Sequence, residues 1–86
     1  MAGAYTLLIK RSAERELRRV PSPHLEQLVQ AIQALATNPR PTGCKKLSES
    51  DAYRIRKGTY RVIYVVDDGK RTVEIYKIGH RREVYR

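Results

Sequence analysis

The chain has 86 residues, of which 18 are Lys or Arg and nine are Asp or Glu, so its formal net charge is +9. This length leaves room for one small core and excludes a multidomain enzyme, and the charge attracts polyanions such as nucleic acids. A single cysteine excludes an internal disulfide. No segment has the apolar core of a signal peptide or the length of a membrane span, so we expect a protein of the reducing cytoplasm with no membrane partner.

The N-terminal half predicts one strand and two helices. The β-prone segment 4–10 predicts the strand. A first helix is expected to begin at Ser12, a suitable N-cap residue. The strongest periodic signal follows at 25–36, where apolar residues recur at the spacing of a helix capped by Ser22. Residues 39–51 contain the Pro, Gly and Ser of a loop.

From Tyr53 onward the apolar pattern changes to a period of two, in segments 53–56, 60–66 and 73–78. Short polar connections separate these segments, which is typical of antiparallel neighbours. The sequence therefore predicts an α+β fold in a single small domain, residues 1–86. The expected order is β-α-α-β-β-β, with both helices packed on one face of a mostly antiparallel, twisted sheet.

Three arginines share one face of this predicted sheet. If the Tyr and aliphatic residues of the strands face the helices, then Arg54, Arg56 and Arg61 point to the opposite face. Taken singly, an arginine on a strand is usually a solvated surface residue. These three begin the most basic part of the chain, because residues 54–86 hold ten bases and four acids, a net charge of +6. They indicate a site for a polyanion.

Arginine clusters suit the cleavage of RNA without a metal. The 2′-OH of RNA can itself attack the phosphate, so the enzyme needs orientation, charge neutralisation and proton transfer. Guanidinium groups bind phosphate oxygens in pairs and stay charged at physiological pH. His24 and His80 lie far apart, and no carboxylate pair has ligand spacing. We therefore expect no metal and no cofactor.

The segment from Gly79 to Arg86 gathers an imidazole, several guanidinium groups and a phenol. It can be a frayed basic terminus. In the functional interpretation arginine neutralises phosphate, His80 transfers a proton and Tyr85 stacks on an unpaired base. We expect these groups to converge with the strand arginines around a phosphate-sized hollow.

Three segments resemble the RelE toxins: Tyr53-Arg54-Ile55-Arg56, Tyr60-Arg61-Val62-Ile63-Tyr64 and Gly79-His80-Arg81-Arg82-Glu83-Val84-Tyr85. The resemblance covers nearly the whole chain. The first two segments also suit the related ParE group, and the third discriminates better. The resemblance implies an mRNA endonuclease that inhibits translation by cutting in the ribosomal A site, leaving a 2′,3′-cyclic phosphate and a 5′-hydroxyl.

The resemblance also implies roles for single residues. Arg54 and Arg56 match the two basic second-strand positions around the nucleophile and phosphate, and Arg61 matches the arginine that supports the transition state. Arg81 matches the group that helps the leaving oxygen, and Tyr85 the one that stacks or assists proton transfer.

The chain departs from the best-known family pattern, which has lysine where this chain has Arg54, Arg56 and His80. A guanidinium is a poor general base, so this role falls to His80, to Tyr85 or to a group of the ribosome. Further RNA contacts are expected from Lys45, Lys46, Lys57, Arg82 and Arg86.

The expected partners are mRNA in the A site of the 30S subunit and a cognate antitoxin. The antitoxin is expected to wrap the toxin and mask its basic face, and the complex to bind its own operator DNA through the antitoxin. Two alternatives remain open: a ParE-like toxin that poisons DNA gyrase without cutting RNA, and a regulatory nucleic-acid binder that is not toxic.

Overall fold

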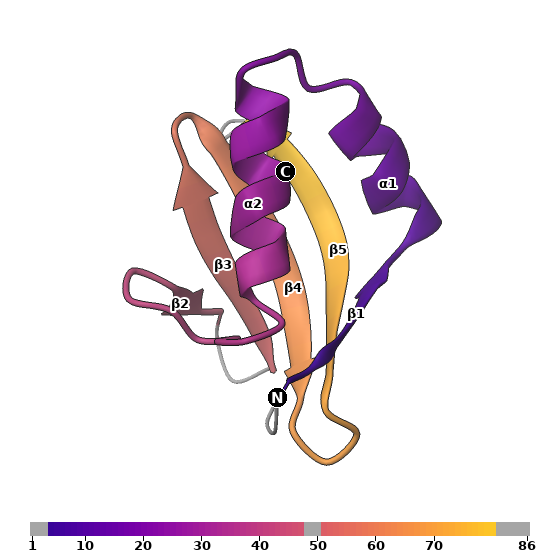
Figure 1. The fold of residues 1–86 in the computed structure, drawn as a ribbon, viewed down its shortest axis with the longest axis vertical. Coiled ribbons are helices and arrows are strands. Elements are labelled where there is room, and N and C mark those ends of the chain that lie inside the picture. Colours follow the sequence, from indigo (N-terminus) through magenta and orange to yellow (C-terminus); the bar gives the residue numbers. More distant parts are fainter. Residues whose placement is uncertain (1–3, 48–50, 81–86) are drawn as a thin grey trace.

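The structure is a computed structural model that describes residues 4–47 and 51–80. Its elements are β1 (Thr6–Ile9), α1 (Arg11–Arg18), α2 (His24–Ala34), β2 (Lys45–Lys46), β3 (Ala52–Lys57), β4 (Tyr60–Asp67) and β5 (Thr72–His80). Both helices lie on one face of the sheet (Figure 1). The expected order is confirmed with one correction. The segment 39–51 is not all loop, because Lys45 and Lys46 pair with β3.

The sheet has five strands in the described residues, in the order β1-β5-β4-β3-β2. Among these described strands β1 and β5 are parallel, and the other neighbours are antiparallel. The predicted, mostly antiparallel sheet is therefore confirmed. The edge strand β2 is short and carries two lysines, features that discourage pairing with another chain.

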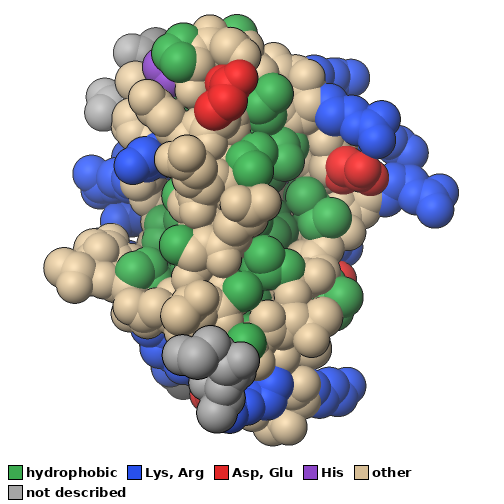
Figure 2. All heavy atoms as spheres, in the orientation of Figure 1, with side chains coloured by type: hydrophobic (Ala, Val, Ile, Leu, Met, Phe, Trp, Pro, Cys, Tyr) green, Lys and Arg blue, Asp and Glu red, His purple; other side chains and the backbone are tan. Residues whose placement is uncertain are grey.

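The core fills the space between the helices and the sheet. Its most buried side chains, at most 1% exposed, include Leu28, Leu35, Val62, Tyr64, Val73 and Ile75. Figure 2 shows the helix-covered face, where apolar side chains gather in the middle and Lys and Arg side chains lie at the margins. The alternation of the strands thus places the apolar residues beneath the helices. Within the described residues, no helix is long and apolar enough to cross a membrane.

Both helices begin without a side-chain cap. α1 starts at Arg11 with Lys10 at the N-cap, so the expected cap at Ser12 is wrong. The chain enters this helix one residue after β1 ends, which moves the start ahead of the serine. The N-cap of α2 is Pro23 rather than Ser22, whose hydroxyl instead donates a hydrogen bond to the Glu26 carboxylate at 2.8 Å.

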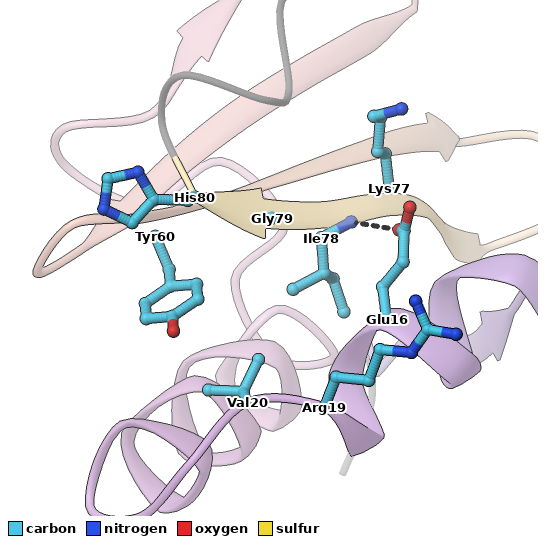
Figure 3. A pocket seen from close by; sticks show the side chains of 8 residues that line it. All are labelled: Glu16, Arg19, Val20, Tyr60, Lys77, Ile78, Gly79 and His80. Carbon is cyan, nitrogen blue, oxygen red and sulfur yellow. Dashed lines mark hydrogen bonds between the residues drawn. The ribbon is translucent and has the colours of Figure 1, made fainter.

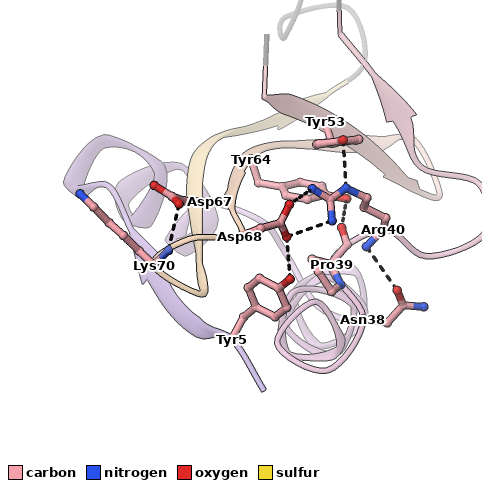
Figure 4. A network of polar contacts seen from close by, with 9 residues as sticks. All are labelled: Tyr5, Asn38, Pro39, Arg40, Tyr53, Tyr64, Asp67, Asp68 and Lys70. Carbon is pink, nitrogen blue, oxygen red and sulfur yellow. Dashed lines mark hydrogen bonds and ion pairs between the residues drawn. The ribbon is translucent and has the colours of Figure 1, made fainter. Parts of the chain in front are cut away.

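A polar network ties together four segments that are distant in sequence (Figure 4). The Arg40 guanidinium donates two hydrogen bonds to the Asp68 carboxylate, at 3.2 and 2.8 Å, and a third to the Tyr53 hydroxyl at 2.9 Å. The Tyr5 hydroxyl donates to the same carboxylate at 2.6 Å. The bonds from Arg40 and then Tyr5 lower the pKa of Asp68. The network joins the loop after α2 to the β4–β5 turn.

Candidate functional site

The helix-free face of the sheet carries a row formed by Arg56, Arg61 and Gly79. Arg56 of β3 is the direct cross-strand partner of Arg61 on β4, and Arg61 is in turn the partner of Gly79 on β5. Side chains of direct partners share a face, with Cβ atoms about 4.5–5.5 Å apart. Gly79 adds no side chain to this row. Two neighbouring guanidinium groups have the charge and geometry to bind an anion.

The next row on the same face lies two residues along each strand and adds three more cations. Lys45 pairs with Arg54, Arg54 with Ile63, and Ile63 with Lys77. Arg54 is only 9% exposed, whereas Arg56 is exposed. A charge held in such surroundings is less screened by water. We call the five cations of the two rows the basic band: Lys45, Arg54, Arg56, Arg61 and Lys77.

The prediction that the three arginines share the helix-free face is confirmed by the strand register. Sequence reasoning missed Lys77, because strict alternation places it with Val73 and Ile75 in the core. A β-bulge breaks the alternation: Ile63 pairs with Lys77, but Tyr64 pairs with Ile75, so Tyr76 has no opposite partner. The extra residue turns Lys77 to the helix-free face. The available signal was a lysine directly before Ile78, at a position where strict alternation expects an apolar residue.

His80 does not join the basic band. It pairs with Tyr60, whose neighbour in β3 is Lys57, and this row belongs to the helix-covered face. The His80 and Tyr60 rings meet edge-on with centroids 5.9 Å apart. The expected convergence of His80 with the arginines is therefore wrong, because one residue along a strand reverses the face. Lys46, which pairs with Tyr53, also lies on the helix side.

A hollow of about 450 Å³ opens beside His80, between the C-terminal end of α1 and the ends of β4 and β5 (Figure 3). We call it the His80 hollow. It is lined by Glu16, Arg19, Val20, Tyr60, Lys77, Ile78, Gly79 and His80, so two residues of the helix-free rows, Lys77 and Gly79, also border it. The Glu16 carboxylate accepts a hydrogen bond from the Ile78 backbone N–H at 2.8 Å. This bond closes part of the β5 edge beyond the end of β1.

Comparisons with known proteins agree with this geometry. A family model described as the ParE toxin of the type II toxin–antitoxin system parDE matches residues 7–85. The toxin RelG of Mycobacterium tuberculosis is 33% identical over an alignment of 84 residues that covers 95% of this chain and 97% of that protein. The chain belongs to the RelE-type toxins of type II toxin–antitoxin systems.

Solved structures support the same family. The isolated RelE toxin of E. coli is 32% identical, with a TM-score of 0.81, over 95% of this chain and 92% of that one. A chain of the toxin–antitoxin complex RelBE2 from M. tuberculosis is 30% identical, with a TM-score of 0.79, over 96% and 98% of the two chains. This RelE-type toxin therefore shares its whole described fold with them.

Four candidate residues of the toxin lie outside the described residues: Arg81, Arg82, Tyr85 and Arg86. Their roles stay predictions. In residues 4–47 and 51–80, no group of three or more His, Cys, Asp or Glu side chains could hold a metal ion. The charged groups of the basic band are guanidinium and ammonium groups.

Proposed function

We propose that this toxin is an RNA endonuclease that uses no metal. It cleaves mRNA in the ribosomal A site of the cytoplasm and so stops translation. The observation that carries the proposal is the row Arg56–Arg61–Gly79, with Arg54 in the neighbouring row. A phosphate seated beside the glycine meets two guanidinium groups, which neutralise the charge that grows on its oxygens during the reaction.

The proposed reaction is a transesterification within the RNA. The 2′-OH loses its proton to a base, its oxygen forms a bond to the adjacent phosphorus, and the bond from phosphorus to the 5′-oxygen breaks. The products are a 2′,3′-cyclic phosphate and a 5′-hydroxyl, whose oxygen takes up, directly or through water, the proton that the base removed. Arg54 and Arg56 orient the nucleophile and phosphate, and Arg61 stabilises the phosphorane charge.

The proton transfers are assigned to groups other than the basic band. Because His80 lies on the other face, we assign the base to Tyr85 or to a group of the ribosome, and the stabilisation of the leaving oxygen to Arg81. Lys45 belongs to the basic band and extends the phosphate contacts. Further RNA contacts are proposed for Lys46, Lys57, Arg82 and Arg86.

We also propose a cognate antitoxin that covers the basic band, and operator DNA that the complex binds through this antitoxin. The M. tuberculosis relative RelBE2 is itself a toxin–antitoxin complex. A net charge of +9 attracts RNA without sequence selection, so the free toxin needs a partner that covers this charge. An acidic, extended or helical segment has the complementary charge.

The test is induced expression in growing cells with mapping of mRNA 5′ ends. The wild type is compared with Arg61→Ala and with Lys70→Ala, which removes one charge in the β4–β5 turn, far from the basic band. Cuts within A-site codons are expected for the wild type and for Lys70→Ala, and not for Arg61→Ala. DNA breaks with intact mRNA refute the proposal and support the gyrase alternative, which the ParE name of the family model favours.

A further inference from the structure

Both histidines of the chain contact the same tyrosine. The Tyr60 ring lies 5.5 Å from the His24 ring and 5.9 Å from the His80 ring. Tyr60 and His80 also line the His80 hollow, together with Gly79 and Lys77 from the two rows of the helix-free face. The hollow therefore combines an aromatic wall with nearby titratable and charged groups, and its occupant needs an explanation.

The lining of the hollow changes from apolar to cationic. Val20 and Ile78, 6% and 2% exposed, form its floor, and Tyr60 forms a wall. The exposed side chains of Arg19 and His80 stand at its rim. One oxygen of Glu16 is held by the Ile78 N–H, and its second oxygen can accept another hydrogen bond. An apolar body with an anionic group and an amino group fits this pattern.

The hollow and the basic band lie at the same end of the sheet. The row Tyr60–His80 is the next residue pair after Arg61–Gly79. Gly79 of the first row and Lys77 of the second row line the hollow as well, so the hollow and the basic band adjoin at β5. A single RNA strand that leaves the basic band can therefore reach the hollow across the edge of β5 beyond its pairing with β1.

We propose that the His80 hollow binds one unpaired nucleotide of the RNA substrate, beside the linkage that is cleaved. The base stacks on Tyr60 above the apolar floor, an exocyclic amino group donates to Glu16, and the phosphate meets Arg19. The volume of about 450 Å³ lies within the range of about 300–1,000 Å³ for ligand pockets. This inference rests on the proposed cleavage of RNA, because it names a second contact of the same substrate.

The first experiment is a titration of the isotope-labelled full-length toxin with adenosine 5′-monophosphate, followed by NMR. Backbone amide signals of Tyr60, Ile78 and His80 are expected to shift at a concentration that saturates the site. Shifts confined to residues of the basic band overturn the inference. Shifts at the hollow with an antitoxin peptide and none with the nucleotide also overturn it, since the occupant is then the antitoxin.

The second experiment measures binding of a 2′-O-methyl RNA hexanucleotide, which lacks the nucleophile, as a function of salt. Arg19→Gln is compared with Arg18→Gln, a matched control whose guanidinium is held by Glu14 at 3.0 Å on the same helix. Loss of one phosphate contact reduces the slope of log K against log salt by about 0.7. We expect that reduction for Arg19→Gln and none for Arg18→Gln, and equal slopes for the two variants overturn the inference.

The ring of Tyr60 is tested with two substitutions. Tyr60→Phe keeps the stacking surface and is expected to bind the hexanucleotide as the wild type does. Tyr60→Leu is expected to bind it roughly tenfold more weakly. Tyr60→Phe also serves as the control for a loss of folding caused by substitution at this position. A-site cleavage by the wild type without nucleotide binding at the hollow refutes only the hollow, whereas nucleotide binding there without cleavage refutes only the nuclease.

Discussion

Arg56 of β3 and Arg61 of β4 are direct cross-strand partners on the helix-free face of the sheet. Like charges in this position repel and destabilise a sheet by roughly 0.2–1 kcal/mol. Repulsion within the pair therefore opposes folding, and an anion bound between the two side chains relieves it. Removing one of the two charges is expected to raise the stability of the protein and to lower its activity.

Arg56→Gln is the first prediction. At low salt the free energy of unfolding is expected to rise by roughly 0.2–1 kcal/mol, because the repulsion from Arg61 disappears. Cleavage of mRNA is expected to fall at the same time. Urea denaturation followed by circular dichroism measures the stability, with Lys70→Gln as the control for a general loss of charge. A variant that is less stable than the wild type contradicts the repulsion.

Arg61→Ala is expected to lower the rate of cleavage on ribosomes by roughly 10²–10³, the cost of removing one group that stabilises the developing charge. Arg61→Lys keeps the charge but loses the paired hydrogen bonds of a guanidinium. Its cleavage rate should therefore lie between those of the wild type and Arg61→Ala. Single-turnover cleavage of mRNA on programmed ribosomes measures the rate. If Arg61→Lys cleaves as fast as the wild type, charge alone is sufficient and the paired geometry has no role.

Lys77→Ala tests a residue that the bulge of β5 brings to the basic band. Its loss should remove one phosphate contact and reduce the salt slope of binding to single-stranded RNA by about 0.7. Lys70→Ala removes the same charge in the turn and should leave the slope unchanged. Filter binding at salt concentrations between about 50 and 300 mM checks both variants.

Tyr64→Phe tests a buried hydrogen bond in the core. The Tyr64 hydroxyl donates to the Pro39 carbonyl at 2.8 Å, and burial raises the pKa of this phenol. Without the hydroxyl the carbonyl loses its donor, which should lower the free energy of unfolding by roughly 1–3 kcal/mol. Urea denaturation measures the change. An unchanged midpoint means that the bond adds nothing to stability.

Asp68→Asn tests the network around Arg40. The pKa of Asp68 is lowered first by the Arg40 hydrogen bond and then by the Tyr5 hydroxyl. Its ionised form therefore stabilises the folded toxin above the unfolded-state pKa of about 3.9, and this contribution is lost as the pH falls through the lowered value. The variant should melt below the wild type at pH 7. The difference should shrink below about pH 4, and a gap that is constant with pH contradicts this account.

The periodic spacing of apolar residues was sufficient to predict most of the architecture. Apolar spacing in segment 25–36 predicted α2, and alternation from Tyr53 predicted three strands, because burial on one face imposes a repeat on each element. Prediction from periodicity failed where a local irregularity determines the structure. The two-residue strand β2 is too short to carry a repeat, and the helix starts depend on where the chain leaves the preceding element.

The sequence by itself determined that this is a basic, two-layer α+β protein whose Arg54, Arg56 and Arg61 share a face, since residue identity and a period of two settle both. Only the tertiary structure decided which groups meet. The bulge at Tyr76 added Lys77 to the basic band, and the pairing of His80 with Tyr60 removed the imidazole from it. Strand register and bulges arise from the packing of the whole sheet, and a one-residue change in either moves a side chain to the opposite face.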